Sequence, residues 1–220
     1  MTDAHWHPLA LSRDVAPGTS AGVVVNGQEI VVWRDLSGTA HAWEDRCPHR
    51  GMKLSFGFVR GDHIACLYHG WEYGADGRCR YIPAHPDLEV PASICVPRHA
   101  CAEGAGMIWA WLPGSAPAGT PPEADVTPVR SLFLDCPLDH ALALAEADPP
   151  EGAASLVRPA PGLARLGAVQ MGLHPVGGDR AALHLALVGA APRARCLALA
   201  DWAAALRRTA EAAPRREAAE

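Results

Sequence analysis

Two short stretches decide how this sequence is read: CPHRG, which begins at Cys47, and CLYHGWEYG, which begins at Cys66. One residue separates Cys47 from His49, two residues separate Cys66 from His69, and sixteen residues lie between the two pairs. The four side chains offer two thiolates and two imidazoles, which are ligands of the softer transition metals. The pattern predicts a metal centre held between two loops.

Three kinds of metal centre use these residue types. Two thiolates on one iron and two neutral imidazoles on the other form the ligand set of a Rieske [2Fe–2S] cluster, in which the histidines raise the reduction potential. A Cys2His2 zinc site separates its first two ligands by about two to four residues, whereas one residue separates Cys47 from His49. A c-type heme needs Cys-x-x-Cys-His, which the sequence lacks. The spacing favours the iron–sulfur cluster, with zinc as the alternative.

Short strands joined by tight turns are predicted from about residue 20 to residue 112. β-branched runs flank Asn26-Gly27, a dipeptide typical of a type I′ hairpin. Glycine and aspartate mark three more turns, at Gly61-Asp62, at Asp76-Gly77 and near Gly104 to Gly106. Closely spaced hairpins predict an antiparallel sandwich or small barrel. Such a sheet can hold the two Cys/His loops face to face.

The composition changes after residue 112. The stretch LPGSAPAGTPPEADVTPVR is rich in proline and predicts an extended, exposed connection. We therefore expect two domains, residues 1–115 and residues 116–220, and a fold that is mainly β with a small α+β segment at the end. The second domain is expected to contain a short helix over LDHALALAEAD, a loop over DPPEGAASLVRPAPG, two strands joined at Gly177-Gly178, and a helix over CLALADWAAALRRTAEAA.

The residues around the two pairs resemble a known family. AWEDRCPHRGMKLSFGFVRGDHIACLYHGWEYGADGRC closely resembles the Rieske domain of the Rieske non-heme iron oxygenases, above all in its CPHRG and YHGWEY boxes. The likeness begins with HWHPLALSRDV and covers about residues 5–112. It implies a Rieske-type antiparallel β-sandwich in which Cys47 and Cys66 bind one iron of a [2Fe–2S] cluster, and His49 and His69 bind the other.

The resemblance is to the oxygenases and their ferredoxins rather than to the respiratory Rieske proteins. Neither loop has the additional cysteine that would form an inter-loop disulfide, and Trp71 stands where the respiratory type has a serine. A hydroxyl donor to the cluster sulfurs would raise the reduction potential. Its absence predicts a lower potential for this chain.

A complete oxygenase of this family has a second domain, whose mononuclear iron is held by two histidines and a carboxylate. In the family, the histidines lie on a helix, in a pattern like Asp-x-x-His followed by four residues and another histidine, which this sequence lacks after residue 112. The second domain therefore resembles a remnant of that catalytic domain. An atypical iron site would have to draw on these residues: Asp135, Asp139, His140, Glu146, His174 and His184.

Three functions are consistent with these patterns. The first is an oxidoreductase component, with no catalytic residues and no catalytic iron of its own, that passes single electrons to a mononuclear iron on a partner oxygenase subunit. A reductase or ferredoxin would be its electron donor, and the assembly would be a hetero-oligomer. The second is a compact oxygenase with the atypical iron site. The third is a soluble Rieske-type ferredoxin, which would need little beyond residue 112.

Composition narrows the partners and the location. A net charge of −5 gives no broad basic surface for nucleic acid or anionic membranes. No leader pattern and no apolar run long enough to span a membrane are present in the sequence. The seven cysteines are odd in number and widely spread, which argues against a disulfide framework. We expect a cytoplasmic protein.

Overall fold

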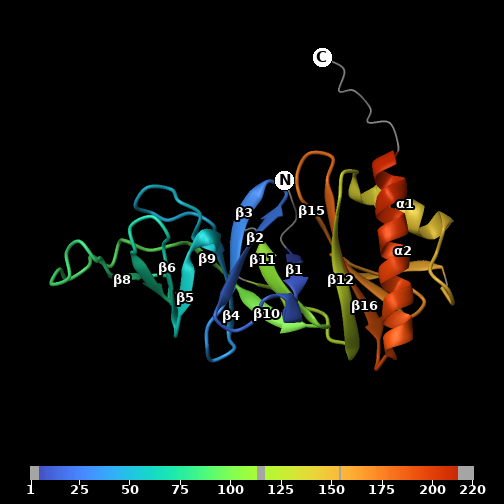
Figure 1. Ribbon diagram of the computed structural model, residues 1–220, viewed down its shortest axis with the longest axis horizontal. Coiled ribbons are helices and arrows are strands. Elements are labelled where there is room, and N and C mark those ends of the chain that lie inside the picture. Colours follow the sequence, from blue (N-terminus) through green and yellow to red (C-terminus); the bar gives the residue numbers. More distant parts are fainter. Residues whose placement is uncertain (1–4, 113–116, 154, 213–220) are drawn as a thin grey trace, which may run out of the picture.

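The computed structural model describes residues 5–112, 117–153 and 155–212 (Figure 1). Strands dominate, and the two α-helices belong to the C-terminal half. In chain order the elements are β1 (His5–Leu11), η1 (Ser12–Asp14), β2 (Thr19–Val25), β3 (Gln28–Arg34), β4 (Ala40–Glu44), η2 (Leu54–Phe56), β5 (Phe58–Arg60), β6 (His63–Ala65), β7 (Glu72–Gly74), β8 (Cys79–Tyr81), β9 (Arg98–His99), β10 (Cys101–Gly104), β11 (Met107–Leu112), β12 (Val126–Leu134), α1 (Leu138–Ala147), β13 (Leu156–Ala160), β14 (Leu163–Leu166), β15 (Val169–Pro175), β16 (Ala181–Val188) and α2 (Arg193–Ala212).

Three antiparallel sheets build the N-terminal half, with strand orders β1-β11-β10, β2-β3-β4-β9 and β5-β6-β7-β8. Strand β3 shows why they stack, because its side chains alternate between two cores. Ile30 and Val32 pack with residues of β1 and β11, whereas Val31 and Trp33 pack with Cys47 and other residues of the loop region. The first Cys/His loop follows β4, and the second joins β6 to β7 in the β5–β8 sheet, which lies at one end of the molecule (Figure 1).

The predicted hairpins are present at their turns. Asn26 and Gly27 both have left-handed φ angles, 50° and 81°, as a type I′ turn requires, and they join β2 to β3. The other three predicted turns join β5 to β6, β7 to β8, and β10 to β11. The expected mainly β class with antiparallel sheets is therefore confirmed.

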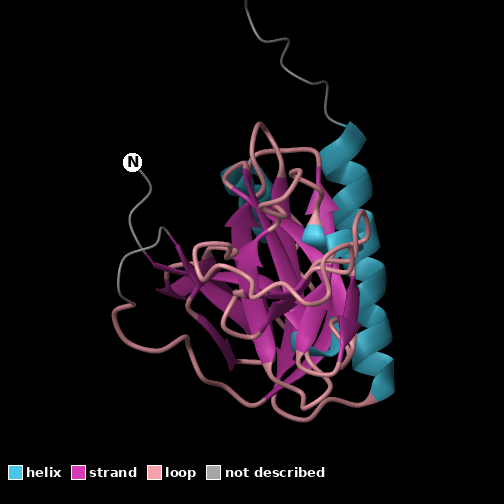
Figure 2. Cartoon of the chain, turned by 90° about the vertical axis from the view of Figure 1, so that its left-hand side faces the viewer, coloured by secondary structure: helices cyan, strands magenta, loops and turns pink. Residues whose placement is uncertain are grey.

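A five-stranded antiparallel sheet, in the order β12-β16-β15-β14-β13, forms the C-terminal half. Strand β16, which lies between β12 and β15, is almost entirely apolar because both of its faces are covered. Leu183 and Leu185 face a core that includes residues of α1 and α2, and His184 between them has the opposite orientation. Both helices lie beyond this sheet, on the side away from the N-terminal half (Figure 1), and α2 runs along the side of the strands (Figure 2). Strand β1, from the N-terminal half, contacts β15, β12 and β16.

Three details of the C-terminal half differ from the sequence predictions. The proline-rich connection ends in a long strand, β12, and the predicted loop DPPEGAASLVRPAPG contains strand β13. The predicted strand pair is three strands, because a turn at Gly167 separates β14 from β15. Both unexpected strands are edge strands with a register shift at or next to a proline, where a missing backbone N–H costs little. No helix among the described residues is long and apolar enough to cross a membrane.

Candidate metal centre

The two Cys/His loops repeat one backbone design. In the first, the Cys47 N–H donates to the carbonyl of Met52 and the Gly51 N–H donates to the carbonyl of Cys47, at 2.8 and 2.9 Å. In the second, Cys66 and Gly70 are the donors, at 2.9 Å to Trp71 and 3.0 Å to Cys66. Equivalent hydrogen bonds in the two loops therefore join residues that are five and four positions apart in the sequence.

The glycine that closes each loop is required by its backbone conformation. Gly51 and Gly70 have φ angles of 72° and 70°, in the left-handed region that side chains rarely adopt. A Cβ on Gly70 would also lie 3.0 Å from Cγ of Pro83. The glycine in each motif therefore sets the loop shape that presents the preceding histidine.

The four candidate ligands form an inner pair and an outer pair. Cys47 and Cys66 are 2% and 3% exposed, at the base of the two loops. His49 is half-buried and His69 is exposed, and their ring centroids lie 4.6 Å apart. The sulfur atoms thus lie inside the domain, and the imidazoles lie together at its surface.

Burial and neighbours set the ionisation of these groups. Burial raises the pKa of the Cys66 thiol, and proximity to Cys47 raises it further, although the backbone N–H groups of Tyr68 and His69 oppose this. Desolvation lowers the pKa of His49, with contributions from His69 and Arg50. The buried Cys66 thiol is thus costly to ionise without a cation, and a neutral imidazole is the form that binds metal.

Aromatic side chains surround the candidate ligands. The Trp71 ring stacks on His49, with centroids 4.3 Å apart and an interplanar angle of 5°. Tyr68 lies over His69 at 3.9 Å. The Tyr73 hydroxyl lies 3.1 Å from Sγ of Cys47, and burial raises the pKa of this phenol, so it stays protonated and can donate to a thiolate. The sequence places Trp71 and Tyr73 in the core over the cluster, but it indicates neither the hydrogen bond of Tyr73 to Cys47 nor the contact of Tyr68 with His69.

This arrangement fits a [2Fe–2S] cluster. Two adjacent thiols can each lose a proton to one iron, while the two neighbouring imidazoles serve the other iron. The described residues contain no group of three or more His, Cys, Asp or Glu side chains placed to hold a single metal ion. The four candidate ligands therefore form two pairs rather than a single site around one metal ion.

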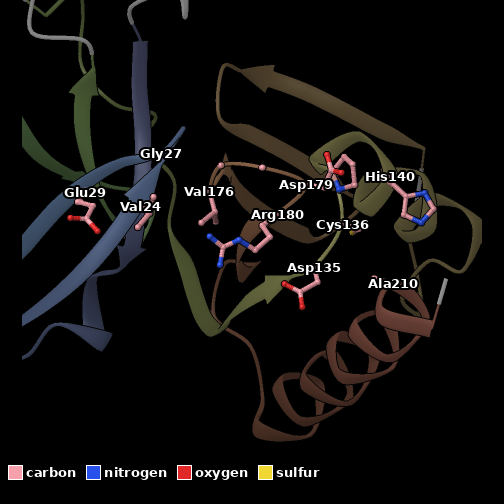
Figure 3. Close-up of a pocket in the computed structure, with 13 residues that line it drawn as sticks. Val24, Gly27, Glu29, Asp135, Cys136, His140, Val176, Asp179, Arg180 and Ala210 are labelled. Atoms are coloured by element: carbon pink, nitrogen blue, oxygen red, sulfur yellow. The ribbon is translucent and has the colours of Figure 1, made fainter. Parts of the chain in front are cut away.

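The histidines of the C-terminal half do not come together in one place. His140 is exposed on α1 and lines a cleft of ≈ 1030 Å³ between that helix, the β2–β3 hairpin and the β15–β16 hairpin (Figure 3). His174 and His184 are buried on β15 and β16, with ring centroids 5.3 Å apart. The cleft also contains charged side chains, from Glu29, Asp135, Asp179 and Arg180.

Comparison with known proteins identifies the N-terminal part of the chain. Residues 5–92 match the family described as Rieske [2Fe-2S] domain. The chain is 34% identical over 147 residues to oxidoreductase NdmD of Pseudomonas putida, covering 63% of this chain and 25% of that protein. It is also 34% identical over 143 residues to protein TIC 55 of Arabidopsis thaliana, covering 62% and 26%. It thus spans about a quarter of the length of these curated relatives.

Solved structures share the fold of both halves. NdmA of Pseudomonas putida CBB5 superposes with a TM-score of 0.67 at 19% identity, covering 98% of this chain and 84% of that one. Apo dicamba monooxygenase superposes with a TM-score of 0.73 at 18% identity, covering 96% and 86%. The matched residues 5–92 thus form a Rieske [2Fe-2S] domain, which indicates a Rieske-type cluster, and the solved structures show that the fold of this chain is shared with known proteins.

Proposed function

We propose that this chain is the electron-transfer component of a Rieske oxygenase system. Cys47 and Cys66 would bind one iron and His49 and His69 the other, and the bound cluster supplies reversible one-electron oxidation and reduction. The electron comes from a reductase or ferredoxin and goes to a mononuclear non-heme iron on a partner subunit. All seven cysteines are free thiols, which suits a reducing compartment such as the cytoplasm.

The observation that carries this proposal is that both imidazoles reach the surface. His49 and His69 reach the surface while both thiols stay buried. A partner that docks there would be separated from iron by no more than an imidazole ring. Electron transfer needs such an approach. The stacked ring of Trp71 and the tilted ring of Tyr68 hold the two imidazoles in place at that surface.

The acceptor iron is assigned to another polypeptide because of where the remaining histidines lie. His140 is exposed on α1 and lines the cleft, whereas His174 and His184 are enclosed between the sheet and β1. Three side chains so placed cannot meet at one ion. The compact oxygenase would need them to move together, and the carrier alternative leaves the whole C-terminal sheet without a role.

The surface around the imidazoles suits an acidic partner. Arg46 and Arg50 are exposed and line a small cleft together with His49. Leu67 and Tyr68, beside His69, are 49% and 59% exposed. An apolar centre with cationic neighbours is complementary to a partner that carries carboxylates around an apolar contact.

Reversing the charge of this surface is expected to slow electron transfer. In the variant Arg46→Glu/Arg50→Glu, the second-order rate of reduction by the host's reductase should fall at least about tenfold at low salt, and the difference should shrink as salt increases. Stopped-flow absorbance of the cluster measures this rate. The double variant Arg193→Glu/Arg195→Glu, at the start of α2 and remote from the loops, changes the net charge by the same amount and is the matched control (Figure 1). Equal rates in the two variants would place the docking surface elsewhere.

Removing the Tyr73 hydroxyl is expected to lower the reduction potential. Its hydrogen bond to Cys47 stabilises negative charge on sulfur, and the reduced state carries more of that charge. Tyr73→Phe should shift the potential by about −30 to −60 mV, where 59 mV corresponds to a tenfold change for one electron. Protein-film voltammetry measures the shift, with Tyr81→Phe, on the partly exposed strand β8, as control. An unchanged potential would show that the hydroxyl does not act on the ligand.

Metal analysis separates the three functions. Protein purified without oxygen is analysed for iron, acid-labile sulfide and the EPR signal after dithionite reduction. About two irons, two sulfides and a Rieske signal, with a partner subunit that copurifies from the native host in fixed stoichiometry, support the proposal. A third iron that is lost on mutating His140, His174 or His184 would establish the compact oxygenase. A lone monomer that reduces several acceptors would establish the carrier.

A further inference from the structure

A row of histidines crosses the interface between the two halves. His5 and His7 on β1 have ring centroids 3.8 Å apart. His7 faces His174 on β15, whose ring lies 5.3 Å from that of His184 on β16. His7, His174 and His184 are 2%, 0% and 1% exposed, so three ionisable rings lie in the interior where the halves meet.

The interface around this row is closely packed. The β2–β3 turn reaches the end of β15, where the N–H groups of Asn26 and Gly27 donate to the carbonyls of Pro175 and Val176 at 2.8 and 2.9 Å. The side-chain amide of Gln170 donates to the Ala105 carbonyl. A small apolar cluster also joins the halves, through Leu11, Met107, Trp109 and Leu163.

One ring nitrogen of His184 has a hydrogen-bond partner. Ser131 Oγ lies 2.8 Å from Nδ1 of His184 and 3.3 Å from Asp14 Oδ2. Nδ1 is therefore satisfied whether Ser131 donates to it or accepts from it. The Nε2 atom of His184 is buried and has no hydrogen-bond partner among the described residues. A second proton would therefore be buried without an acceptor.

The other two rings are in a similar position. Nδ1 of His7 and both ring nitrogens of His174 are buried without a hydrogen-bond partner in the described structure, although carbonyls of Pro8 and Val24 approach the His174 ring. Buried nitrogens without partners often mark a metal site, but the described residues contain no group of three ligand side chains placed for one ion. Another role must account for three such rings at one interface.

We propose that His7, His174 and His184 form an acid-sensitive latch, which holds the two halves together when neutral and releases them when protonated. In the closed form each ring packs as an uncharged group between the sheets. In the open form each ring meets water and takes up a proton. Acid therefore favours separation of the N-terminal half from the C-terminal sheet, and this device is independent of the proposed electron-transfer function.

The charged groups around the row favour the neutral rings. The other facing groups are His5 on β1, Asp14 and Arg13 on η1, and Arg165 on β14, which binds Gln170 on the interface side of β15. Asp14 is the one carboxylate among them; it is part-exposed and reaches His184 only through Ser131. β2 and β11 contribute no ionisable side chain. Few negative charges thus lie close enough to stabilise a protonated histidine in this row.

The direction of the pH effect follows from these surroundings. Burial lowers the pKa of His7 to about 3 and that of His174 to about 4, and it lowers the pKa of His184 well below 6.5. The closed form therefore binds fewer protons than the open form, in which each pKa is about 6.5. Closure is complete above pH 6.5 and weakens as pH falls toward 4. In that window, each histidine changes the equilibrium between the closed and open forms by a factor of about ten per pH unit.

Release need not unfold either half, because each has a core of its own. The N-terminal cores contain residues of β1 to β11, whereas the C-terminal core contains residues of β12, β14 to β16 and both helices. The cluster loops lie at the end of the molecule remote from the interface (Figure 1). The latch can thus open while the cluster stays bound.

Hydrogen exchange at the interface tests the proposal on the full holoprotein. The Asn26 and Gly27 amides report closure, since their acceptors belong to the other half, and amides within β3 and β16 report the two cores. Between pH 7 and pH 5, after correction for the intrinsic exchange rate, protection of the interface amides should fall at least about 100-fold. The core amides and the EPR signal of the cluster should be unchanged.

Variants identify the histidines responsible. In His174→Gln/His184→Gln, which keeps polar groups of similar size, the loss of interface protection over the same range should fall to about 30-fold or less, because one latch histidine remains. His140→Gln, an exposed histidine outside the row, should behave as the wild type. Unchanged interface protection in the wild type, loss of the cluster signal at the same pH, or an equal effect of His140→Gln would overturn the latch. If the double variant does not fold, the single variant His184→Gln and the pH titration of the wild type still test the latch.

Discussion

Replacing Cys66 with serine is expected to remove the cluster. The Cys66 sulfur is almost fully buried beside Cys47, and a serine hydroxyl is a hard, weakly acidic donor that poorly replaces a thiolate on iron. Iron and acid-labile sulfide should fall from about two each to near zero per chain, and the Rieske EPR signal should disappear. The melting temperature should fall as well, because binding of the cluster contributes to folding.

The control for this experiment is Cys95→Ser. Cys95 is also a free thiol in the N-terminal half, but it is exposed and lies outside both loops. This variant should keep its iron, its sulfide and its spectrum. Full cluster content in Cys66→Ser, or loss of the cluster in Cys95→Ser, would contradict the assignment of the ligands.

Truncating Trp109 is expected to have the largest effect on stability away from the cluster. Trp109 is fully buried on β11, its indole N–H donates to the Gly104 carbonyl at 2.8 Å, and its ring packs with Leu163 across the interface of the two halves. Trp109→Ala should lower the free energy of unfolding by about 3–5 kcal/mol, through lost burial and a cavity. For a chain of this size, each kcal/mol corresponds to about 2–4 °C in Tm.

Trp202→Ala is the matched comparison. Trp202 on α2 also donates its indole N–H to a backbone carbonyl, that of Asp148 at 2.7 Å, but its ring is only half-buried. We expect a loss of about 1–2 kcal/mol, since less apolar area returns to water. Urea titrations followed by circular dichroism measure both variants. A smaller loss for Trp109→Ala than for Trp202→Ala would show that the interface contributes little to stability.

The sequence predicts the N-terminal fold well because its signals are local. Asn26-Gly27 needs no tertiary information to specify a tight hairpin, and the other three turns carry similar residues. The C-terminal half is harder to predict, since β12 and β13 contain Pro128 and Pro159, which indicate a loop unless the strand is known to be an edge. Edge position depends on the topology of the whole sheet.

The candidate site, too, is predictable from the sequence only where its signals are local. Cys47, His49, Cys66 and His69 are recognisable from spacing, because each pair lies within one loop. The contact between Tyr73 and Cys47 joins residues 26 positions apart, and the histidine row joins β1 to strands more than 160 residues away. Such contacts arise from packing between elements, and no short sequence pattern encodes them.

The loop geometry also bears on the order of events in turnover. Of the four candidate ligands, His49 and His69 are the two that reach the surface, and they lie side by side. Under the proposed function, electrons would both enter from the reductase and leave to the partner subunit through this one patch. A partner subunit that stays bound in fixed stoichiometry must therefore leave part of the patch open, so that the reductase can dock before each electron is passed on.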